Sequence, residues 1–513
     1  MLHSSTVQQA RQPGARYQRH QPENTTLYPI IEQNLPALRD ALQQREASLP
    51  GFVLAEFEDY LRCGRLEHGF VRVKCNSCRH EHLVAFSCKR RGFCPSCGAR
   101  RMIETSAHFI DHVFPEVPVR QWVLSFPQAL RLLFASRPDA LSRCLAVIVR
   151  AIQTDLTHRA GLTTSRGART GVITLIQRFG SALNLNVHLH MLILDGVYTL
   201  EQNGPQFHRV AAPDAPSLER LLNRLVARIL RRLTRDGLLV QDPEQPWLDL
   251  EPTDTLDQLN AASIRYRIAV GQGAGGRTLT LKNPVLARTD STPKPFTANR
   301  DGFSLNAAVA CQAHQRDQLE RLCRYITRPA LCLERLSTNA DGQVVYQLKN
   351  PFRDGTTHVL FSPQEFLARL AALVPRPRVN LTRYHGVFAP SSPMRRAIVP
   401  SKASGRRRSK TKDPANATLS RKPEESNTHH PDLPTAPDLP TAPLTWAQRL
   451  KRVFEFDITL CPLCGGQLRV IADITDPDLI RKILDHRISR APPRRPPQRA
   501  KPHPTLPDLF AEN

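Results

Sequence analysis

The chain has 513 residues, with 71 Lys and Arg against 46 Asp and Glu, and its formal net charge is +25 at pH 7. So large a positive charge favours a polyanionic partner, either nucleic acid or an anionic membrane surface. No uncharged apolar run approaches the ~18 residues of a membrane span, and the N-terminus lacks the apolar segment of a signal peptide. We therefore expect a cytoplasmic protein that does not enter a membrane, and the length allows about three domains.

The first 400 residues are predicted to form an arm, a cysteine-rich domain and one large α+β domain. Residues 1–29 are polar and predict a flexible arm, and residues 30–112 predict a helical, zinc-binding domain. Residues 115–400 contain alternating apolar runs, typical of strands, and amphipathic runs, typical of helices. Strands are expected at 119–126, 171–179 and 184–194, helices at 138–158, 216–234, 315–328 and 365–373, and a hairpin at 344–349 and 357–361.

The composition changes after residue 400. Residues 401–444 are basic and rich in proline, contain DLPTAP twice in tandem, and cannot bury enough apolar surface to fold. We predict a disordered linker there, a small ordered module at 445–490 and a disordered tail at 491–513. Residues 395–422 carry a net charge of +9 and residues 481–501 one of +7, more than half of the total. These segments are expected to contact DNA phosphates non-specifically.

The twelve cysteines favour metal binding over disulfides, because a cytoplasmic protein lies in a reducing compartment. Two CxxC pairs, each able to present two thiolates from a tight turn, are separated by fifteen residues. Four thiolates complete a tetrahedral zinc shell. We therefore predict one structural zinc in an N-terminal zinc ribbon, with the ligands Cys75, Cys78, Cys94 and Cys97.

Other candidate ligands and contacts lie near this pattern. Cys88, His80 and His82 fall inside the loop and are substitute ligands, members of a second site or solvated loop residues. Cys63 is interpreted as a thiol buried beside the ribbon. The charge run that includes Lys89, Arg90 and Arg91 is either a DNA phosphate contact or a solvated face.

A further pair of cysteines lies in the C-terminal module. Cys461 and Cys464 form a CxxC turn followed by two glycines, which is half of a zinc site. No second pair follows it. His486 is a candidate third ligand, and a second chain is a candidate source of the rest. We therefore treat a second zinc here as an open alternative.

Two histidines alternate with apolar residues at 184–191. Strand geometry places His188 and His190 on one face, about 7 Å apart along the chain. Their rings can converge on one divalent cation. The alternative is a half-exposed strand whose polar face only meets water.

The helix at 315–328 has an apolar stripe with Tyr325 beside it. Gln318, Arg321 and Arg328 share the side of the helix that carries Tyr325. A tyrosine near arginines can meet a phosphate, since guanidinium groups neutralise its charge. The alternative is a boundary tyrosine packed over the edge of the core.

Together these segments resemble the rolling-circle transposases of the insertion-sequence-ninety-one family, which belong to the HUH (His-hydrophobe-His) nucleases. The resemblance spans roughly residues 30–400 and 446–490. It rests on the order of several segments: CKRRGFCPSCGARR (88–101), VRQWVLSFP (119–127), VHLHMLILDGVY (187–198), LERLCRYITRPAL (319–331), RDGTTHVLFSPQEFLARLAALVP (353–375), YHGVFAPSSPMRRAIVP (384–400) and CPLCGGQLRVIADITDP (461–477). Arg321 and Pro329 stand four residues to either side of Tyr325, so the chain is more like the single-tyrosine, ISCR-like branch.

The resemblance implies an antiparallel sheet with flanking helices and a central histidine strand. It implies that His188 and His190 hold magnesium or manganese, and that Tyr325 attacks single-stranded DNA at element ends to form a 5′-phosphotyrosine. Gln318, Glu320 and Asp195 are candidates for a third metal ligand, and Tyr384 and His385 lie in a family-like motif. Target DNA and a host helicase are the expected partners, with nucleoid association and a homodimer as further expectations.

Two other functions fit parts of this pattern. A plasmid replication initiator or relaxase would use the same chemistry, although the N-terminal ribbon and the CPLCGG segment favour the transposase. A zinc-dependent DNA-binding regulator without catalysis would share the charge and the cysteines. A covalent adduct with single-stranded DNA would separate the enzymes from the regulator.

Overall fold

The computed structural model describes residues 21–163, 167–240, 247–248, 254–271, 273–287, 295–400, 459–461 and 463–489. The predicted linker, the predicted tail and most of the predicted arm lie outside these residues. Within the described part, none of the helices combines the length and the apolar character needed to cross a membrane.

An antiparallel sheet with β5 (Leu185–Leu194) as a middle strand forms the centre of the fold. Its strand order in the described chain is β11-β12-β3-β5-β4-β17, and β13 also pairs with β3. The other strands are β3 (Val119–Ser125), β4 (Gly171–Phe179), β11 (Thr297–Arg300), β12 (Phe303–Asn306), β13 (Ala310–Cys311) and β17 (Thr382–Gly386). The expected antiparallel sheet with a central histidine strand is therefore confirmed.

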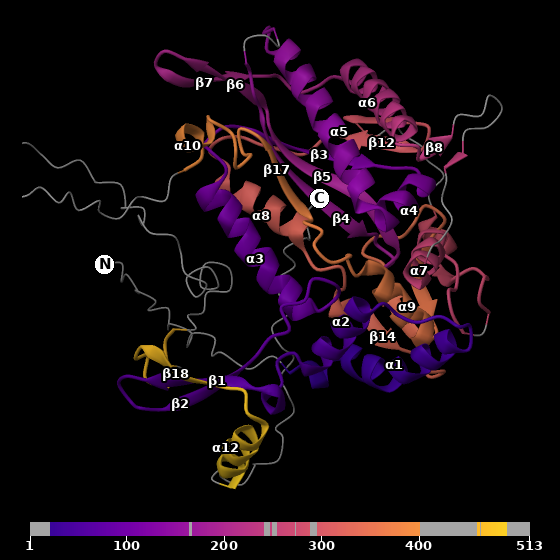
Figure 1. Ribbon diagram of the computed structural model, residues 1–513, viewed down its shortest axis with the longest axis vertical. Coiled ribbons are helices and arrows are strands. Elements are labelled where there is room, and N and C mark those ends of the chain that lie inside the picture. Colours follow the sequence, from indigo (N-terminus) through magenta and orange to yellow (C-terminus); the bar gives the residue numbers. More distant parts are fainter. Residues whose placement is uncertain are drawn as a thin grey trace, which may run out of the picture.

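Helices cover both faces of this sheet (Figure 1). Val187, Leu189 and Met191 of β5 share a core with α4 (Gln128–Ser136), α5 (Pro138–Arg159) and α6 (Ala215–Arg235). Leu192 and Leu194 point to the opposite face and share a core with α3 (Pro95–His112) and α8 (Arg316–Thr327). Because side chains alternate along a strand, His188 and His190 lie on the face that α3 and α8 cover.

A second sheet lies beside the first, in the order β10-β16-β15-β14. Its strands are β10 (Leu279–Lys282), β14 (Leu336–Thr338), β15 (Val344–Gln347) and β16 (Thr356–Phe361), and the last two form the predicted hairpin. It shares one apolar core with the helices α1 (Leu27–Gln43), α2 (Gly51–Arg62), α7 (Thr255–Ile264) and α9 (Pro363–Leu373). The first two helices therefore pack against the large domain, and α1 begins inside the segment predicted as an arm.

A small ribbon projects from the main body at the lower left of Figure 1. It contains β1 (Phe70–Cys75), β2 (Glu81–Ala85) and β18 (Leu468–Ile474) in the order β18-β1-β2. Beside it lie η2 (Leu66–His68) and α12 (Pro477–Ser489). The C-terminal segment, which we predicted as a module of its own, is thus part of the N-terminal ribbon.

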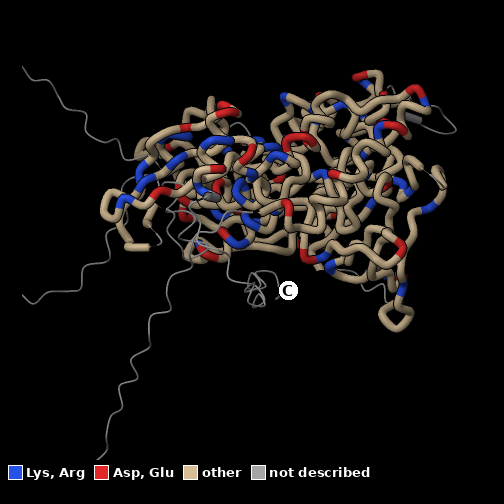
Figure 2. The backbone as a smooth tube through the Cα atoms, turned by 90° about the horizontal axis from the view of Figure 1, so that it is seen from below, with Lys and Arg blue, Asp and Glu red and all other residues tan. Residues whose placement is uncertain are grey.

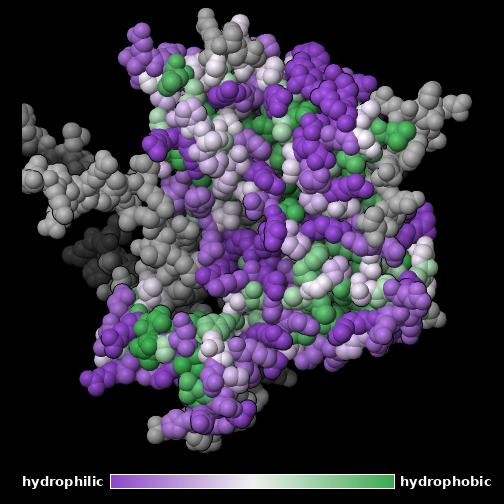
Figure 3. Space-filling view, in the orientation of Figure 1, coloured by the Kyte–Doolittle hydropathy of each residue, from purple (hydrophilic) through white to green (hydrophobic). Residues whose placement is uncertain are grey.

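The core of this ribbon is small. Among the described residues the buried side chains of its apolar core are Phe70, Ile474 and Ile480. Val470 and Ile471 of β18 are exposed, and Figure 3 shows an apolar patch over the region of β1, β2 and β18. So few buried side chains contribute little stability, and ribbons of this size are commonly held by a metal.

The remaining elements are short connections at the edges of these layers. They are η1 (Pro22–Asn24), β6 (Gly196–Glu201), β7 (Gly204–Arg209), β8 (Leu239–Val240), β9 (Trp247–Leu248), η4 (Pro284–Leu286), η5 (Leu333–Arg335) and α10 (Arg395–Ile398).

Candidate functional site

His188 and His190 face each other in the buried layer between β5 and the helices that cover it. Their Nε2 atoms are 3.1 Å apart, and the two side chains are 9% and 6% exposed. The rings come together because residues two apart on a strand point to the same side. The convergence expected from the sequence is therefore present in the fold, although the pair is buried rather than half-exposed.

Each imidazole has a hydrogen-bond partner at its other nitrogen. The Nδ1 of His188 lies 2.8 Å from the carbonyl oxygen of Asn186, so Nδ1 carries the proton and Nε2 keeps a lone pair. The Nδ1 of His190 lies 2.7 Å from the side-chain amide of Gln121 on β3. An amide can offer either its NH2 group or its oxygen to an imidazole. In the structure the amide Nε2 of Gln121 faces Nδ1, so the amide donates and the Nε2 of His190 carries the proton. If the amide turns so that its oxygen faces Nδ1, the proton moves to Nδ1 and the Nε2 of His190 also presents a lone pair.

Burial keeps both imidazoles neutral. It lowers the pKa of His188 to about 4 and holds the pKa of His190 well below its usual value, and the positive charge of Arg328 adds to both effects. A divalent cation binds the neutral form of imidazole, since the proton and the metal compete for the same lone pair. Two neutral rings with facing Nε2 atoms thus fit a metal ion when the amide of Gln121 presents its oxygen to His190.

None of the predicted third ligands joins this pair in the described part of the chain. Carboxylates that could complete a group of three ligand atoms with His188 and His190 are absent there. Asp195 forms a buried two-bond ion pair with Arg120, with both N–O distances at 3.0 Å, and Glu320 pairs with Arg324 at 3.7 Å. Gln318 is exposed on α8. The polar side chain that does contact the pair is Gln121, which the sequence reading missed.

Tyr325 lies near the end of α8, half-buried against the core on the histidine face. The guanidinium of Arg328 stacks over its ring at 4.1 Å from the ring centroid and donates to the Tyr325 carbonyl at 2.6 Å. The ammonium of Lys349 lies 5.9 Å from the same ring. Two cationic side chains therefore surround this phenol, and only Arg328 of the two is predicted from the sequence.

A hydrogen bond ties the end of α8 to the strand beside the histidines. The amide of Gln177 on β4 donates to the carbonyl of Ile326 at 3.1 Å. Gln177 is the cross-strand partner of His188 in the β4–β5 ladder. The backbone next to Tyr325 is thereby fixed to the position directly opposite His188. Arg328, which stacks on Tyr325 and acts electrostatically on both imidazoles, forms a second link.

Tyr384 and His385 lie on the edge strand β17 rather than at this pair. The ring of Tyr384 packs edge-on against Phe109 of α3 with 6.3 Å between ring centroids. His385 pairs with Val172 across β17 and β4, and burial lowers its pKa to about 4. Both residues support the sheet at a position away from the histidines.

The cysteines form two groups of four in the described chain, and neither is the predicted one. Cys94 and Cys97 join Cys63 and Cys88, whereas Cys75 and Cys78 join Cys461 and Cys464. The predicted single site is therefore wrong. Its two CxxC pairs are separated by the β1–β2 hairpin, since six residues of strand span about 17 Å. Cys88 follows the open end of that hairpin, and Cys78 lies at its turn.

The first group, which we call the helix-end cluster (Cys63, Cys88, Cys94 and Cys97), surrounds the N-terminus of α3. The Sγ of Cys97 is 3.8 Å from that of Cys63 and 3.4 Å from that of Cys88. Cys94 caps α3 and Cys97 belongs to its first turn, where the helix dipole favours thiolates. Cys63, which we interpreted as a buried thiol, is thus a candidate ligand.

Helix α3 connects this cluster to the helix of Tyr325. At one end, a side chain at Gly98 would approach Pro329 to 3.0 Å, so the glycine permits close contact just beyond α8. At the other end, Arg316 of α8 donates to carbonyls at and just beyond the C-terminus of α3, namely those of Ile110, Phe114 and Pro115. A metal at the helix-end cluster would therefore hold the element against which α8 packs.

Some of the basic residues predicted to contact DNA phosphates bond to groups within the protein. Arg90 forms an ion pair with Asp59 at 2.6 Å, and Arg91 donates to the carbonyl of Val379 at 2.7 Å. Arg321 is exposed on α8. Figure 2 shows Lys and Arg gathered in the middle of that view and toward its left. These positions remain predicted DNA contacts.

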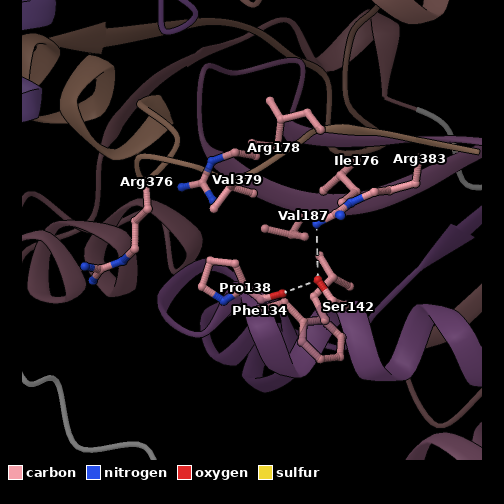
Figure 4. Close-up of a pocket in the computed structure, with 11 residues that line it drawn as sticks. Phe134, Pro138, Ser142, Ile176, Arg178, Val187, Arg376, Val379 and Arg383 are labelled. Atoms are coloured by element: carbon pink, nitrogen blue, oxygen red, sulfur yellow. Dashed lines mark hydrogen bonds between the residues drawn. The ribbon is translucent and has the colours of Figure 1, made fainter.

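A pocket on the opposite face of the sheet is also cationic (Figure 4). Arg178, Arg376 and Arg383 line it. Burial lowers the pKa of Arg178 to about 10, with the charge of Arg376 adding to the effect. Arg376 is neutralised by Asp254 and Asp257, and Arg383 donates to Ser142 at 3.4 Å. The pocket lies on the α4–α5 side and does not include the histidines.

Two family models match the chain, and both describe transposases. The model "Transposase zinc-binding domain" (Zn_Tnp_IS91) matches residues 31–126, and the model "Putative transposase" (Y2_Tnp) matches residues 171–396. The first contains the helix-end cluster, and the second contains both histidines and Tyr325. These findings define a zinc-binding protein of DNA transposition.

Together the two matched ranges cover more than half of the sequence. Both matches are consistent with an IS91-family transposase. No curated protein matches it, and no solved structure does.

Proposed function

We propose that the protein cuts and rejoins single-stranded DNA at insertion-element ends through a 5′-phosphotyrosine, as an HUH enzyme of rolling-circle transposition. The observation that carries this proposal is the bond from Gln177 to the Ile326 carbonyl, which anchors the end of the tyrosine helix opposite His188. A nucleophile and a metal-binding pair on one face are what cleavage of a phosphodiester requires.

His188 and His190 would hold the magnesium or manganese ion. Such an ion polarises the scissile phosphate and neutralises its developing charge. The carbonyl of Asn186 and the amide of Gln121 orient the two rings. Burial keeps the rings neutral and therefore able to bind a cation.

Tyr325 is the proposed nucleophile. Its phenol oxygen forms a bond to phosphorus while the bond from phosphorus to the 3′ oxygen breaks, and that oxygen leaves as a 3′-hydroxyl after taking a proton. The phenol gives its proton to solvent. Arg328 and Lys349 lie beside the ring, where their charges favour an anionic phosphate and a developing phenolate. The covalent bond conserves the energy of the phosphodiester for the joining step, so no nucleotide needs to be hydrolysed.

The proposed partners follow from this chemistry. The substrates are single-stranded element ends and a target strand, and a host helicase separates the strands. Helix α8 contains one tyrosine, Tyr325, and therefore offers one nucleophile per chain. Cleavage of two strands then requires either two sequential rounds by one chain or a homodimer.

The direct test is a search for a covalent adduct. Labelled single strands that tile the DNA on both sides of the gene are incubated with the protein and magnesium, then separated under denaturing conditions. A labelled band at the mass of protein plus DNA is expected from single-stranded DNA, and none from the same sequence as a duplex. A non-catalytic regulator would bind DNA without the adduct. Joining of two element ends in cells separates a transposase from a replication initiator.

We expect the change Gln121→Leu to weaken divalent-cation binding about 10- to 100-fold, because the orienting partner of a metal-bound histidine is lost. Gln121→Glu, which keeps an acceptor for the Nδ1 proton, should retain the affinity or raise it. The measurement is the manganese concentration at half-maximal nicking. Equal concentrations for Gln121→Leu and the parent would contradict the role of Gln121.

We expect the change Cys94→Ser to release one zinc per chain and to slow adduct formation as well as weaken DNA binding. The reason is that the helix-end cluster holds α3, and α3 supports α8. Zinc content by elemental analysis and adduct rate at saturating DNA are the readouts. Cys332→Ser, a cysteine outside both groups, is the control. Full zinc content in the Cys94 variant would refute the assignment.

A further inference from the structure

The second group of cysteines, which we call the split cluster (Cys75, Cys78, Cys461 and Cys464), joins two segments that are far apart in the chain. The Sγ atoms of Cys75 and Cys464 are 3.5 Å apart, and those of Cys78 and Cys461 are 3.6 Å apart. All four Sγ atoms lie within 4.8 Å of one another. Zinc–sulfur bonds of about 2.3 Å at tetrahedral angles place thiolates about 3.8 Å apart. A disulfide would require about 2.05 Å.

The two halves of this cluster have the same backbone turn. In the first, the N–H of Cys75 donates to the carbonyl of His80, and the N–H of Arg79 donates back to Cys75. In the second, the N–H of Cys461 donates to the carbonyl of Gly466, and the N–H of Gly465 donates back to Cys461. The fifth residue of each turn, Arg79 or Gly465, has a positive φ, of 59° and 73°. Two segments separated by more than 380 residues thus form matching thiolate turns.

The contact between the halves leaves no room for an additional side chain. A Cβ atom at Gly466 would lie 2.4 Å from the Oγ of Ser77 and 3.0 Å from the Sγ of Cys75. The N–H of Asn76 donates to the carbonyl of Gln467 at 2.9 Å, and β18 continues from there as the antiparallel partner of β1. The second glycine after Cys464 is therefore required for the close approach of the two turns.

We propose that the split cluster binds a second zinc, and that this zinc fastens residues 459–489 to the N-terminal hairpin. The family match to the zinc-binding domain ends at residue 126, so two of the four ligands lie outside it. The apolar core that β18 and α12 share with the hairpin is small, so the metal supplies much of the attachment. This proposal concerns the assembly of the ribbon and does not depend on the reaction at Tyr325.

The test uses the full chain with a protease recognition sequence inserted between the two DLPTAP repeats, after residue 437. After purification and cleavage, the two fragments are examined by size-exclusion chromatography and native mass spectrometry, and zinc is measured per chain. We expect two zinc ions and co-migration of the fragments. Removal of the metal with a chelator should separate them.

The double change Cys461→Ser and Cys464→Ser should leave one zinc and release the C-terminal fragment. Cys78→Ser, on the other side of the contact, should have the same effect, while Cys332→Ser should have none. We expect fragment affinity to fall at least about 100-fold, since structural zinc contributes several kcal/mol to such assemblies. Two zinc ions in the double variant, or co-migration that survives both the double change and the chelator, would overturn the proposal. The adduct assay of the full chain reports on Tyr325 separately.

Discussion

Replacement of Tyr325 by Phe is expected to abolish the covalent protein–DNA adduct while leaving DNA binding within about twofold of the parent. The substitution removes a single oxygen atom, and Phe keeps the ring against which Arg328 stacks, so the local packing should persist. Without the phenol oxygen no bond to phosphorus can form. Denaturing gels with labelled single strands measure the adduct, and fluorescence anisotropy measures the binding.

The matched control is Tyr384→Phe. Tyr384 lies on the same face of the sheet but packs against Phe109 on α3, away from the histidine pair. It should form the adduct at the rate of the parent. Persistence of the adduct in Tyr325→Phe, or its loss only in Tyr384→Phe, would show that the nucleophile has been assigned to the wrong residue.

Alanine at His188 or His190 is expected to reduce metal-dependent nicking by at least about 1,000-fold. A divalent cation at a phosphoryl centre supplies several kcal/mol, and each 1.36 kcal/mol corresponds to a factor of ten in rate. Each substitution also leaves the other imidazole without its partner at 3.1 Å. Nicking rates across a magnesium titration provide the measurement.

His358→Ala serves as the control for the histidine variants. His358 belongs to β16 in the second sheet and bonds to Thr357 rather than to the histidine pair. Its nicking rate should match that of the parent. If His188→Ala retains the parental rate and metal dependence, the metal site lies elsewhere.

The large elements could be predicted because their periodicity is strong. The strand at 184–194 and the helix at 315–328 were placed within a residue or two, since alternation and the apolar stripe each fix one buried face. Helix α3 was missed because Cys94 is its N-cap and Cys97 lies in its first turn, and a CxxC pair is typical of a metal-binding loop. The packing of α1 against the second sheet could not be predicted, because an apolar helix face indicates that the face is buried but not which element it packs against.

The histidines and the tyrosine were identified as candidates from the sequence, but their surroundings were not. Gln121 lies in a strand that was predicted. A single glutamine in a strand does not indicate a contact with the histidines until β3 is known to lie beside β5. Lys349 follows β15 of the second sheet, and its approach to Tyr325 depends on how the two sheets pack. The cysteine pairing failed for a related reason. Identical CxxC spacings show which thiolates form a pair, but not which pairs meet in space.

The ribbon is built from two segments that lie far apart in the chain, and this separation sets an order of events during synthesis. Cys75 and Cys78 leave the ribosome early, and Cys461 follows Cys78 by 383 residues. At about 5–20 residues per second, this interval lasts about 20 to 80 s. The proposed second zinc cannot acquire its full ligand set before then, whereas all ligands of the helix-end cluster emerge together. A nascent or truncated chain would thus contain the histidines and Tyr325 but an unfinished ribbon, so that complete translation becomes a condition for the mature ribbon.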